Sequence, residues 1–426
     1  MTESRAAASL PAMINPKRRP VRLLTIGHSY VVALNRRMAH AIADASDGRY
    51  EVTVVAPSFF HGDLRPIALE PYKGSRAEPV TVLPLRVHGS KRPHMFVFER
   101  RLKDVLRQEW DLVHCWEEPY VFAGAQIAWW AQAHTPLVYL TYQNIAKRYP
   151  PPFGWLETRT LQRAQGLISG GRTVAEVQQV RVATARAHAR STDAFAEDII
   201  TLGVDTAVFT PDAQARRRMR DQLGLVEADG PVVVYMGRLV EEKGIRVLMS
   251  AMTNQARSGR PHQLLILGAG PMESDLRAWA AQHPHRVRVF TAVPHEDVPD
   301  YLRAADVLIA PSQTRPTWRE QLGRMLLEGF ATGLAVVGSD SGEIPYVIAD
   351  AGIVVPEADE CAWSDAIGEL LAQPDRIQSL GRKGRARAEA TYSWDAVGIR
   401  LVQYFERVLG LGADVSASAS TMRVPG

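Results

Sequence analysis

The sequence predicts an α/β protein made of two doubly wound domains that face a central cleft. Short Val/Ile/Leu runs alternate with longer amphipathic stretches, a pattern typical of parallel sheets built from βα units. The alternation occurs twice, and Pro211, Asp212 and the charged run Arg216–Arg218 separate the two series. Because such domains bind ligands at the carboxyl ends of their strands, two of them together predict a cleft between those ends.

The first series predicts an N-terminal domain over residues 21–210. A helical pattern over residues 31–45 follows the first strand, which places a βα unit at the start of the domain. The expected strands are residues 21–26, 51–56, 80–87, 111–115, 137–141 and 166–169.

The second series predicts a C-terminal domain over residues 211–393. A final helix is expected from Trp394 to about Leu409, with Ser393 as its N-cap and Gly410 after its end. This helix, about residues 394–410, is assigned to the first domain. The expected strands are residues 232–236, 264–267, 287–290, 307–310, 335–337 and 353–355.

The chain ends and the cysteines indicate which segments are disordered and where the protein is located. Residues 1–20 contain Lys17–Arg19 without a continuous apolar core, and predict a disordered basic arm rather than a secretory signal. Residues 411–426 predict a disordered tail. Two cysteines, Cys115 and Cys361, form neither a disulfide framework nor a paired metal motif, which favours a cytoplasmic location. No apolar run approaches the roughly 18 residues of a membrane helix.

Charge is divided unevenly between the two halves. Residues 1–210 carry a net positive charge and the remainder a net negative one. A basic first half suits an anionic partner such as a membrane surface, a lipid phosphate or a nucleic acid. An arginine-rich composition without functional meaning is the other interpretation.

Two basic residues mark a candidate anion site in the second series. Arg238 and Lys243 lie in the segment Gly237–Gly244, directly after the strand expected over residues 232–236. At a strand-to-helix turn, backbone amides and the helix N-terminus already favour anions. The pair therefore predicts charge that stabilises a bound phosphate, against the alternative of ordinary surface charges around a helix cap.

Two glutamates and a glycine turn complete the candidate site. Glu320 and Glu328 would share one face if the stretch between them were helical. Solvated carboxylates on an amphipathic helix are the alternative. Gly268 and Gly270 follow another expected strand, where glycine lets the backbone approach a flat or phosphorylated ligand.

These motifs resemble the donor site of glycosyltransferase family 4, retaining enzymes with the GT-B fold of two Rossmann-like domains. The likeness runs from about residue 21 to 410 and is strongest in the second domain. It implies that Glu328 holds the ribose of a nucleotide sugar, with Glu320 and the amides of Gln321, Leu322 and Gly323 beside the transferred sugar.

The resemblance also assigns the remaining donor contacts and the path of the last helix. It implies that Arg238 and Lys243 stabilise the departing diphosphate, that the backbone at Val293 reads the nucleobase, and that Gly27 lies near the donor phosphates. The final helix is expected to cross back onto the first domain. This chain has a single glycine, Gly27, where the family has a glycine-rich loop.

The acceptor side belongs to the first domain in this family. His28 follows the first strand, and Glu117 and Glu118 follow a strand that ends at the cleft, so these residues are candidates for the acceptor site. Gln143 stands where the family commonly has a histidine near the sugar. It is a further acceptor-side candidate, and general-base chemistry by an imidazole does not carry over.

No metal or cofactor is expected. The sequence lacks an Asp-x-Asp pair, a His-x-x-x-His or Cys-x-x-Cys zinc motif and the phosphate-loop motif of NTPases. The resemblance, which extends to bacterial envelope and exopolysaccharide glycosyltransferases, implies a hexosyltransferase whose donor is UDP-, GDP- or ADP-linked, and the missing motifs make it metal-independent. Its acceptor would be a lipid-linked, oligosaccharide or other envelope glycan, and its location cytoplasmic, with possible peripheral contact with an anionic membrane.

Two rival functions come from other classes. A GT-B epimerase acting on the nucleotide sugar itself would need catalytic acids and bases in place of an acceptor site. A non-enzymatic nucleic-acid-binding protein would use the basic first half, but it leaves Arg238, Lys243, Glu320 and Glu328 unexplained, so no nucleic-acid partner is expected. A dehydrogenase is disfavoured because Gly27–Ser29 lacks the Gly-x-Gly-x-x-Gly fingerprint.

Overall fold

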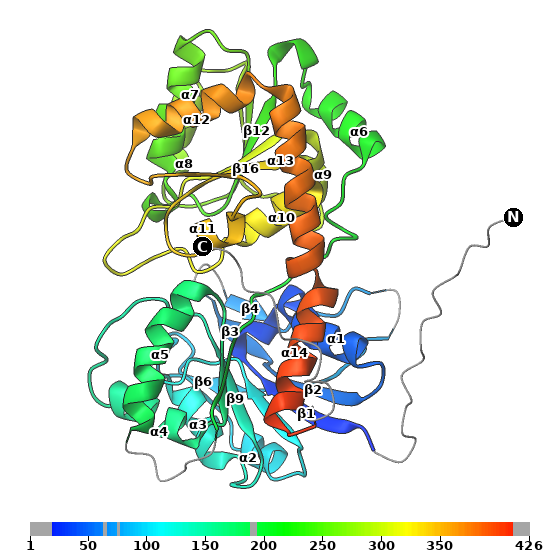
Figure 1. Ribbon diagram of the computed structural model, residues 1–426, viewed down its shortest axis with the longest axis vertical. Coiled ribbons are helices and arrows are strands. Elements are labelled where there is room, and N and C mark those ends of the chain that lie inside the picture. Colours follow the sequence, from blue (N-terminus) through cyan, green and yellow to red (C-terminus); the bar gives the residue numbers. More distant parts are fainter. Residues whose placement is uncertain (1–18, 63–65, 75–76, 188–193, 412–426) are drawn as a thin grey trace, which may run out of the picture.

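The computed structural model describes residues 19–62, 66–74, 77–187 and 194–411, which form two α/β domains stacked along the long axis of the molecule (Figure 1). The predicted basic arm and C-terminal tail lie outside the described residues, apart from their inner ends. Arg19, placed in the arm by the sequence, donates two hydrogen bonds to the Asp111 carboxylate at 2.7 and 2.9 Å.

The first domain is built on a seven-stranded parallel sheet in the order β11-β10-β9-β8-β1-β2-β5. Its long runs of buried Val, Ile and Leu fit a sheet covered on both faces. The strands are β1 (Val21–Ile26), β2 (Tyr50–Pro57), β5 (Thr81–Leu85), β8 (Leu112–Cys115), β9 (Leu137–Thr141), β10 (Gly166–Ser169) and β11 (Ala196–Ile199), with two antiparallel pairs, β3 (Phe59–His61) with β4 (Pro66–Ala68) and β6 (Val87–His88) with β7 (Val97–Phe98).

The predicted strands of this domain are present, but one of them is divided, and β3, β4, β7 and β11 were not predicted. The run predicted over residues 80–87 is divided into β5 and β6, and Pro84 is accommodated because β5 is an edge strand. Strand β11 was not predicted, because its sequence Ala-Glu-Asp-Ile carries two acidic residues at the opposite sheet edge. The helices are η1 (His28–Val31), α1 (Ala33–Ser46), α2 (Arg101–Leu106), α3 (Phe122–Trp130), α4 (Phe153–Arg163) and α5 (Arg172–Arg186).

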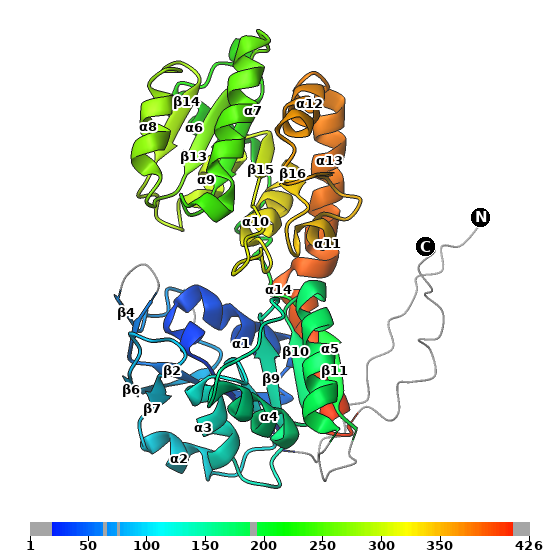
Figure 2. The same cartoon turned by 90° about the vertical axis from the view of Figure 1, so that its left-hand side faces the viewer.

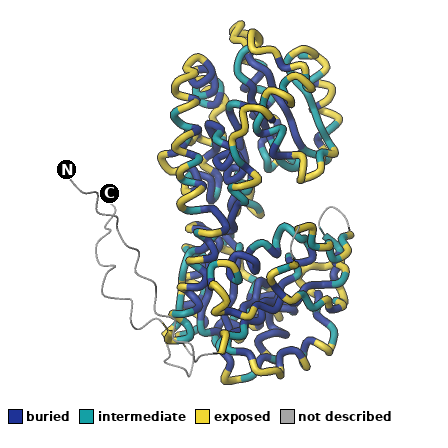
Figure 3. The backbone as a smooth tube through the Cα atoms, turned by 90° about the vertical axis from the view of Figure 1, so that its right-hand side faces the viewer, coloured by how far each residue is buried: buried dark blue, intermediate teal, exposed yellow. Residues whose placement is uncertain are grey.

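The second domain has a six-stranded parallel sheet in the order β14-β13-β12-β15-β16-β17, and all six strands were predicted. Buried cores line its faces, as Figure 3 shows by the dark interior of each domain. The strands are β12 (Val232–Met236), β13 (Gln263–Leu267), β14 (Val287–Phe290), β15 (Val307–Ala310), β16 (Ala335–Ser339) and β17 (Ile353–Val355). The helices are α6 (Ala213–Leu223), η2 (Glu227–Asp229), η3 (Glu241–Lys243), α7 (Ile245–Arg257), α8 (Glu273–Ala280), α9 (Val298–Ala304), α10 (Arg324–Thr332), α11 (Ile344–Ile348), α12 (Glu360–Leu371), α13 (Pro374–Arg387) and η4 (Ala388–Tyr392).

The final helix, α14 (Trp394–Val408), crosses back onto the first domain, as the resemblance implied (Figures 1 and 2). Its N-cap is Ser393, whose hydroxyl accepts a hydrogen bond from the amide of Ala396, which confirms the predicted start. Helix α14 packs against α1 so closely that a Cβ added at Gly398 would lie 2.3 Å from the carbonyl oxygen of Ala41. This contact joins the last described helix to α1 of the first domain.

Candidate functional site

A cleft of about 820 Å³ lies between the carboxyl ends of the two sheets. Both domains line it with segments that directly follow strands: η1 after β1, the turn after β8, the turn after β12 and the loop between β15 and α10. The predicted residues that meet here are His28, Glu117, Glu118, Arg238, Lys243, Glu320, Gln321, Leu322, Gly323 and Glu328.

The centre of the cleft is a buried ion pair. The Lys243 ammonium donates to Glu320 Oε2 at 2.5 Å, and the Ser312 hydroxyl donates to the same oxygen at 2.8 Å. Both charged side chains are nearly buried, with 12% and 8% of their surface exposed. Lys243 Nζ also lies 5.1 Å from the centroid of the Trp318 ring. The pair places a positive charge and an oriented carboxylate side by side, with both side chains largely removed from water.

Glu320 and Glu328 do not share a helix face, so the helical arrangement considered for this stretch is wrong. Glu320 lies in the loop before α10, and Gly323 has a φ of 73°, a left-handed conformation that an α-helix excludes. Glu328 lies within α10, where its carboxylate is 3.3 Å from His295 Nε2. Both carboxylates still line the cleft, but from two different elements.

Arg238 occupies the turn directly after β12. Its guanidinium forms an i,i+4 ion pair with Glu242 at 3.5 Å and remains 39% exposed. Lys243 closes η3, and Gly244 then begins α7 with a left-handed φ of 72°. Because the N-termini of α7 and α10 adjoin these residues, helix dipoles add to the positive potential on this side of the cleft.

On the first-domain side, His28 and Glu117 form a pair. The buried Glu117 carboxylate accepts hydrogen bonds from the His28 amide at 2.5 Å and, through its other oxygen, faces His28 Nδ1 at 2.7 Å. The His28 ring stacks on Phe60 with 4.9 Å between centroids. The contact with Glu117 and the stacking on Phe60 together fix the orientation of the imidazole, whose side chain is 36% exposed.

Glu118 has a different environment from Glu117. Its carboxylate accepts from the Thr141 hydroxyl at 2.5 Å and from the Tyr142 amide at 2.9 Å. Burial raises the pKa of Glu118, and the two hydrogen bonds act in the opposite direction. Glu118 therefore joins the end of β9 to the turn after β8, and shapes the wall of the cleft.

Five predicted residues lie outside the lining of the cleft. Gly27 is packed against Trp116, and Val293 packs against the core of its domain. Gly268 and Gly270 allow the turn after β12 to pack closely against them. A Cβ added at Gly268 would lie 1.9 Å from the Gly237 oxygen, and one added at Gly270 would lie 2.4 Å from the Leu239 oxygen. Buried Gln143 uses its side-chain oxygen to accept from the Ile145 amide at 3.0 Å.

Two ionisable side chains of the cleft, those of Arg324 and His295, were not predicted as site residues. Arg324 opens α10 and donates to Asn35 Oδ1 at 3.1 Å, which makes it a cation shared between the domains. His295 faces Glu328 and follows Val293 in the same loop. His295 could have been found in the sequence, because it lies in the loop already predicted to contact the nucleobase through Val293. Nothing in the sequence distinguishes Arg324 from the many other arginines.

Metal-binding clusters are absent from the described residues, in which no three His, Cys, Asp or Glu side chains gather. Within the same residues, no helix combines the length and the apolar character needed to cross a bilayer.

The fold and cleft place the molecule among proteins with the GT-B fold, in which two Rossmann-like domains enclose the site. Two solved structures show the likeness: a glycosyltransferase from Rickettsia africae (13% identity, TM-score 0.68, covering 92% of this chain and 99% of that one) and a sucrose-phosphate synthase from Thermosynechococcus elongatus (20%, 0.62, covering 92% and 100%).

The sequence narrows the class further. Residues 230–373 match the family model described as glycosyl transferases group 1, and the chain carries a domain of this family. A GDP-mannose-dependent alpha-(1-6)-phosphatidylinositol monomannoside mannosyltransferase of Mycolicibacterium smegmatis is 38% identical over 211 residues, 47% of this chain and 54% of the relative. An alpha-D-kanosaminyltransferase of Streptomyces kanamyceticus is 30% identical over 202 residues, 46% and 50%. The chain spans about half the length of the curated relatives it matches.

Proposed function

We propose that this protein is a retaining hexosyltransferase that moves a sugar from a nucleotide-sugar donor to a glycan or lipid-linked acceptor. The observation that carries the proposal is the buried Lys243–Glu320 pair, with Arg238 on the same side of the cleft. An epimerase is disfavoured because the relatives are named as transferases.

The proposed reaction breaks the bond between the anomeric carbon and the distal phosphate oxygen, and the bonding electrons leave with the diphosphate. An acceptor hydroxyl forms the new bond to that carbon from the same face, and its proton passes to the departing phosphate. Arg238 and Lys243 would stabilise the developing negative charge, as preorganised cations do in a site with little water. Glu320 would orient the sugar and Glu328 the ribose.

The donor and acceptor are part of the proposal. Relatives named as GDP-mannose-dependent make GDP-mannose the first donor to test, with UDP- and ADP-linked sugars beside it. The names of the same relatives contain phosphatidylinositol, which supports a phosphate-bearing lipid as the acceptor class. Peripheral contact between this chain and an anionic membrane is part of the proposal, and the net positive charge of residues 1–210 supports it.

A thermal-shift panel of GDP, UDP and ADP, followed by their sugars, tests nucleotide binding. A nucleotide present at about 100 times its dissociation constant stabilises the folded protein by roughly 2.7 kcal/mol. The selected donor is then used to measure transfer with and without EDTA. We expect transfer to continue in EDTA; complete loss that manganese restores would contradict a metal-free reaction.

The variant Lys243→Ala tests the role of the cation. Loss of a preorganised charge typically lowers turnover by about 100-fold or more. Lys383→Ala removes an equivalent charge from the exposed face of α13 and serves as the matched control. Equal transfer rates in the two variants would show that the ion pair of Lys243 with Glu320 is structural and does not serve the reaction.

A further inference from the structure

Two further hollows lie near the cleft, and residues of the first domain line both of them. The nearer one, of about 430 Å³, lies between residues 144–146 of the first domain and the loop containing Arg315 and Arg319 of the second. Its lining residue Asn144 donates to the backbone oxygen of Glu320 at 3.1 Å, so it adjoins the centre of the cleft. The outer one, of about 650 Å³, shares Ala146 and Val177 with the nearer. The two hollows together form a path, and the hydrogen bond from Asn144 to Glu320 places this path beside the cleft of the proposed active site.

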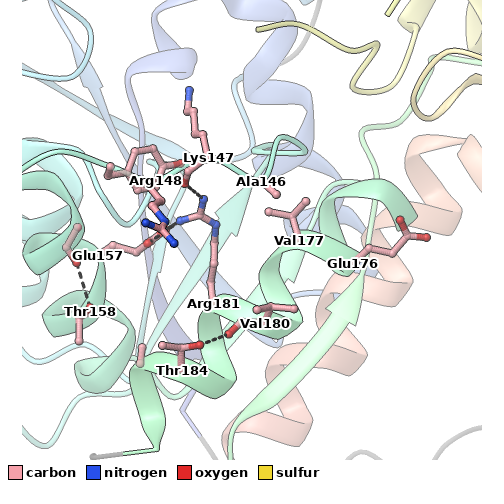
Figure 4. Close-up of a pocket in the computed structure, with 13 residues that line it drawn as sticks. Ala146, Lys147, Arg148, Glu157, Thr158, Glu176, Val177, Val180, Arg181 and Thr184 are labelled. Carbon is pink, nitrogen blue, oxygen red and sulfur yellow. Dashed lines mark hydrogen bonds and ion pairs between the residues drawn. The ribbon is translucent and has the colours of Figure 1, made fainter. Parts of the chain in front are cut away.

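The outer hollow is an apolar groove between α4 and α5 (Figure 4). Val177 and Val180 of α5 form one wall, and the Val180 side chain is 69% exposed. Two of the charges inside it neutralise each other: Arg181 pairs with Glu157 at 2.7 Å and lies over the Tyr149 ring at 4.5 Å. An exposed valine beside neutralised charges suits an aliphatic chain, because covering apolar surface is favourable.

Arginines line both hollows: Arg148 lines the groove, and Arg315 and Arg319 line the nearer hollow. Arg148, Arg315 and Arg319 are exposed, and no ion pair involves any of them within the described part of the chain. Glu176, an acidic residue of the groove, points away from the Lys147 and Arg148 end (Figure 4). Arginines without anionic partners at a groove entrance fit a phosphate group, which they bind through several donors.

We propose that this path binds a lipid acceptor that carries a phosphate, with the phosphate at Arg148, Arg315 and Arg319 and the aliphatic chain between α4 and α5. The glycan end of such a lipid would then reach the cleft. This inference rests on the proposed function, since it names the acceptor and the place where its lipid part binds.

A neighbouring aromatic pair indicates that the lipid comes from a membrane. Trp155 of α4 and Trp129 of α3 are 53% and 54% exposed, and their ring centroids are 5.9 Å apart. Arg159 lies over the Trp155 ring at 5.9 Å. Exposed tryptophans beside cations are typical of residues at the interface of a bilayer. Helix α4, which forms one wall of the groove, therefore also presents the kind of surface that binds at a bilayer interface.

Isothermal titration calorimetry measures the affinity of the protein for decyl phosphate, which carries both a phosphate and an aliphatic chain. Inorganic phosphate tests the phosphate alone, and decyl maltoside tests the aliphatic chain alone. We expect decyl phosphate to bind more tightly than either. Val180→Asp should weaken this binding about tenfold, because a charge in the groove opposes burial of the chain. Ala183→Asp, which adds the same charge to the exposed face of α5 outside the groove, should bind as wild type does.

The arginines are tested by Arg315→Ala combined with Arg319→Ala. Binding of decyl phosphate should fall about tenfold or more at low salt. The control combines Arg217→Ala with Arg218→Ala, exposed arginines of α6 away from the path. Decyl phosphate affinity equal to the controls in both the groove and the arginine variants would overturn the inference.

The membrane source is tested by co-sedimentation with phosphatidylcholine vesicles that contain phosphatidic acid. Trp155→Gln should reduce vesicle binding while leaving decyl phosphate binding unchanged; unchanged vesicle binding would contradict the membrane origin. All variants should bind the nucleoside diphosphate normally. Failure of the wild-type protein to bind any nucleotide would instead count against the proposed function.

Discussion

Lys243 is the cation within hydrogen-bond distance of the Glu320 carboxylate, and both side chains are almost removed from water. A buried carboxylate without its partner is costly, by about 3–5 kcal/mol where one member of such a pair is removed. Glu328 differs, because its neighbour His295 is 48% exposed and 3.3 Å away. The two glutamates therefore have different electrostatic surroundings, which suits two different tasks.

Glu328→Gln should mainly weaken nucleotide binding, whereas Glu320→Gln should mainly slow transfer. A carboxylate that accepts two ribose hydroxyls forms charge-assisted bonds, and their loss costs about 1.5–3 kcal/mol. Calorimetry with the free nucleoside diphosphate measures this directly, with Glu369→Gln on the surface as the control. Wild-type nucleotide affinity in Glu328→Gln would refute the ribose assignment.

His114 should make the fold sensitive to mild acid. Burial lowers the pKa of His114 to about 3, while the unfolded chain protonates it near its ordinary value of about 6.5. The neutral ring, bonded through Nδ1 to the Thr25 hydroxyl at 2.8 Å, therefore contributes stability that is present above pH 6.5 or so and is lost as the pH falls toward the folded pKa.

The measurement is the free energy of unfolding by urea at several pH values. Between about pH 6 and pH 5, the wild-type protein should lose about 1 kcal/mol more per pH unit than His114→Gln. His285→Gln, at an exposed histidine, should follow the wild type. Parallel curves for wild type and His114→Gln would contradict this account.

At the scale of elements, the turn between β16 and α11 packs against the loop between β15 and α10 and determines its position. Gly342 has a φ of 56°, and a Cβ added there would lie 2.1 Å from the backbone oxygen of Glu320. The same Glu320 oxygen accepts from the Glu343 amide at 3.0 Å. Glycine at position 342 thus allows the close approach that positions the loop carrying Glu320.

Gly342→Ala should therefore damage the site beyond its effect on the backbone. The left-handed conformation alone costs an alanine about 1–2 kcal/mol. Gly48→Ala provides the matched control, because Gly48 has a φ of 75° with nothing within 4 Å of the added Cβ. Both variants should lose stability, but only Gly342→Ala should lose donor-sugar binding. Normal donor binding in Gly342→Ala would show that Glu320 tolerates the shift.

At the scale of the whole molecule, Glu343 links the domains at the N-terminus of α5. Its carboxylate accepts from the amides of Arg172 and Thr173 at 2.7 and 2.9 Å, and from the Thr173 hydroxyl at 2.7 Å. Burial raises the pKa of Glu343, against these hydrogen bonds. An anion at a helix N-terminus is favourable, so this contact supports the relative placement of the domains.

Glu343→Ala should let the domains separate, because it removes three hydrogen bonds across their boundary. Small-angle X-ray scattering should give a larger radius of gyration for this variant than for wild type. Glu343→Gln, which keeps one acceptor oxygen, should lie between them. Equal radii for all three proteins would show that the crossing helix α14 and its packing on α1 hold the domains without Glu343.

By itself, the sequence determined what depends on near neighbours along the chain. Hydrophobic periodicity was enough for the β12–β17 strands, and the Ser393 cap was enough for the start of α14, because both depend on local chemistry. The basic turn containing Arg238 and Lys243 was visible for the same reason.

Only the tertiary structure decided the partners of the charged groups. Lys243 meets Glu320 from 77 residues away, and His28 meets Glu117 from 89 residues away. The left-handed Gly323 places Glu320 in a loop, although a helix through position 320 fitted the spacing. Strand crossovers and the contact between domains bring such groups together, and their burial gives the charges their strength, because electrostatic interactions grow where water is excluded.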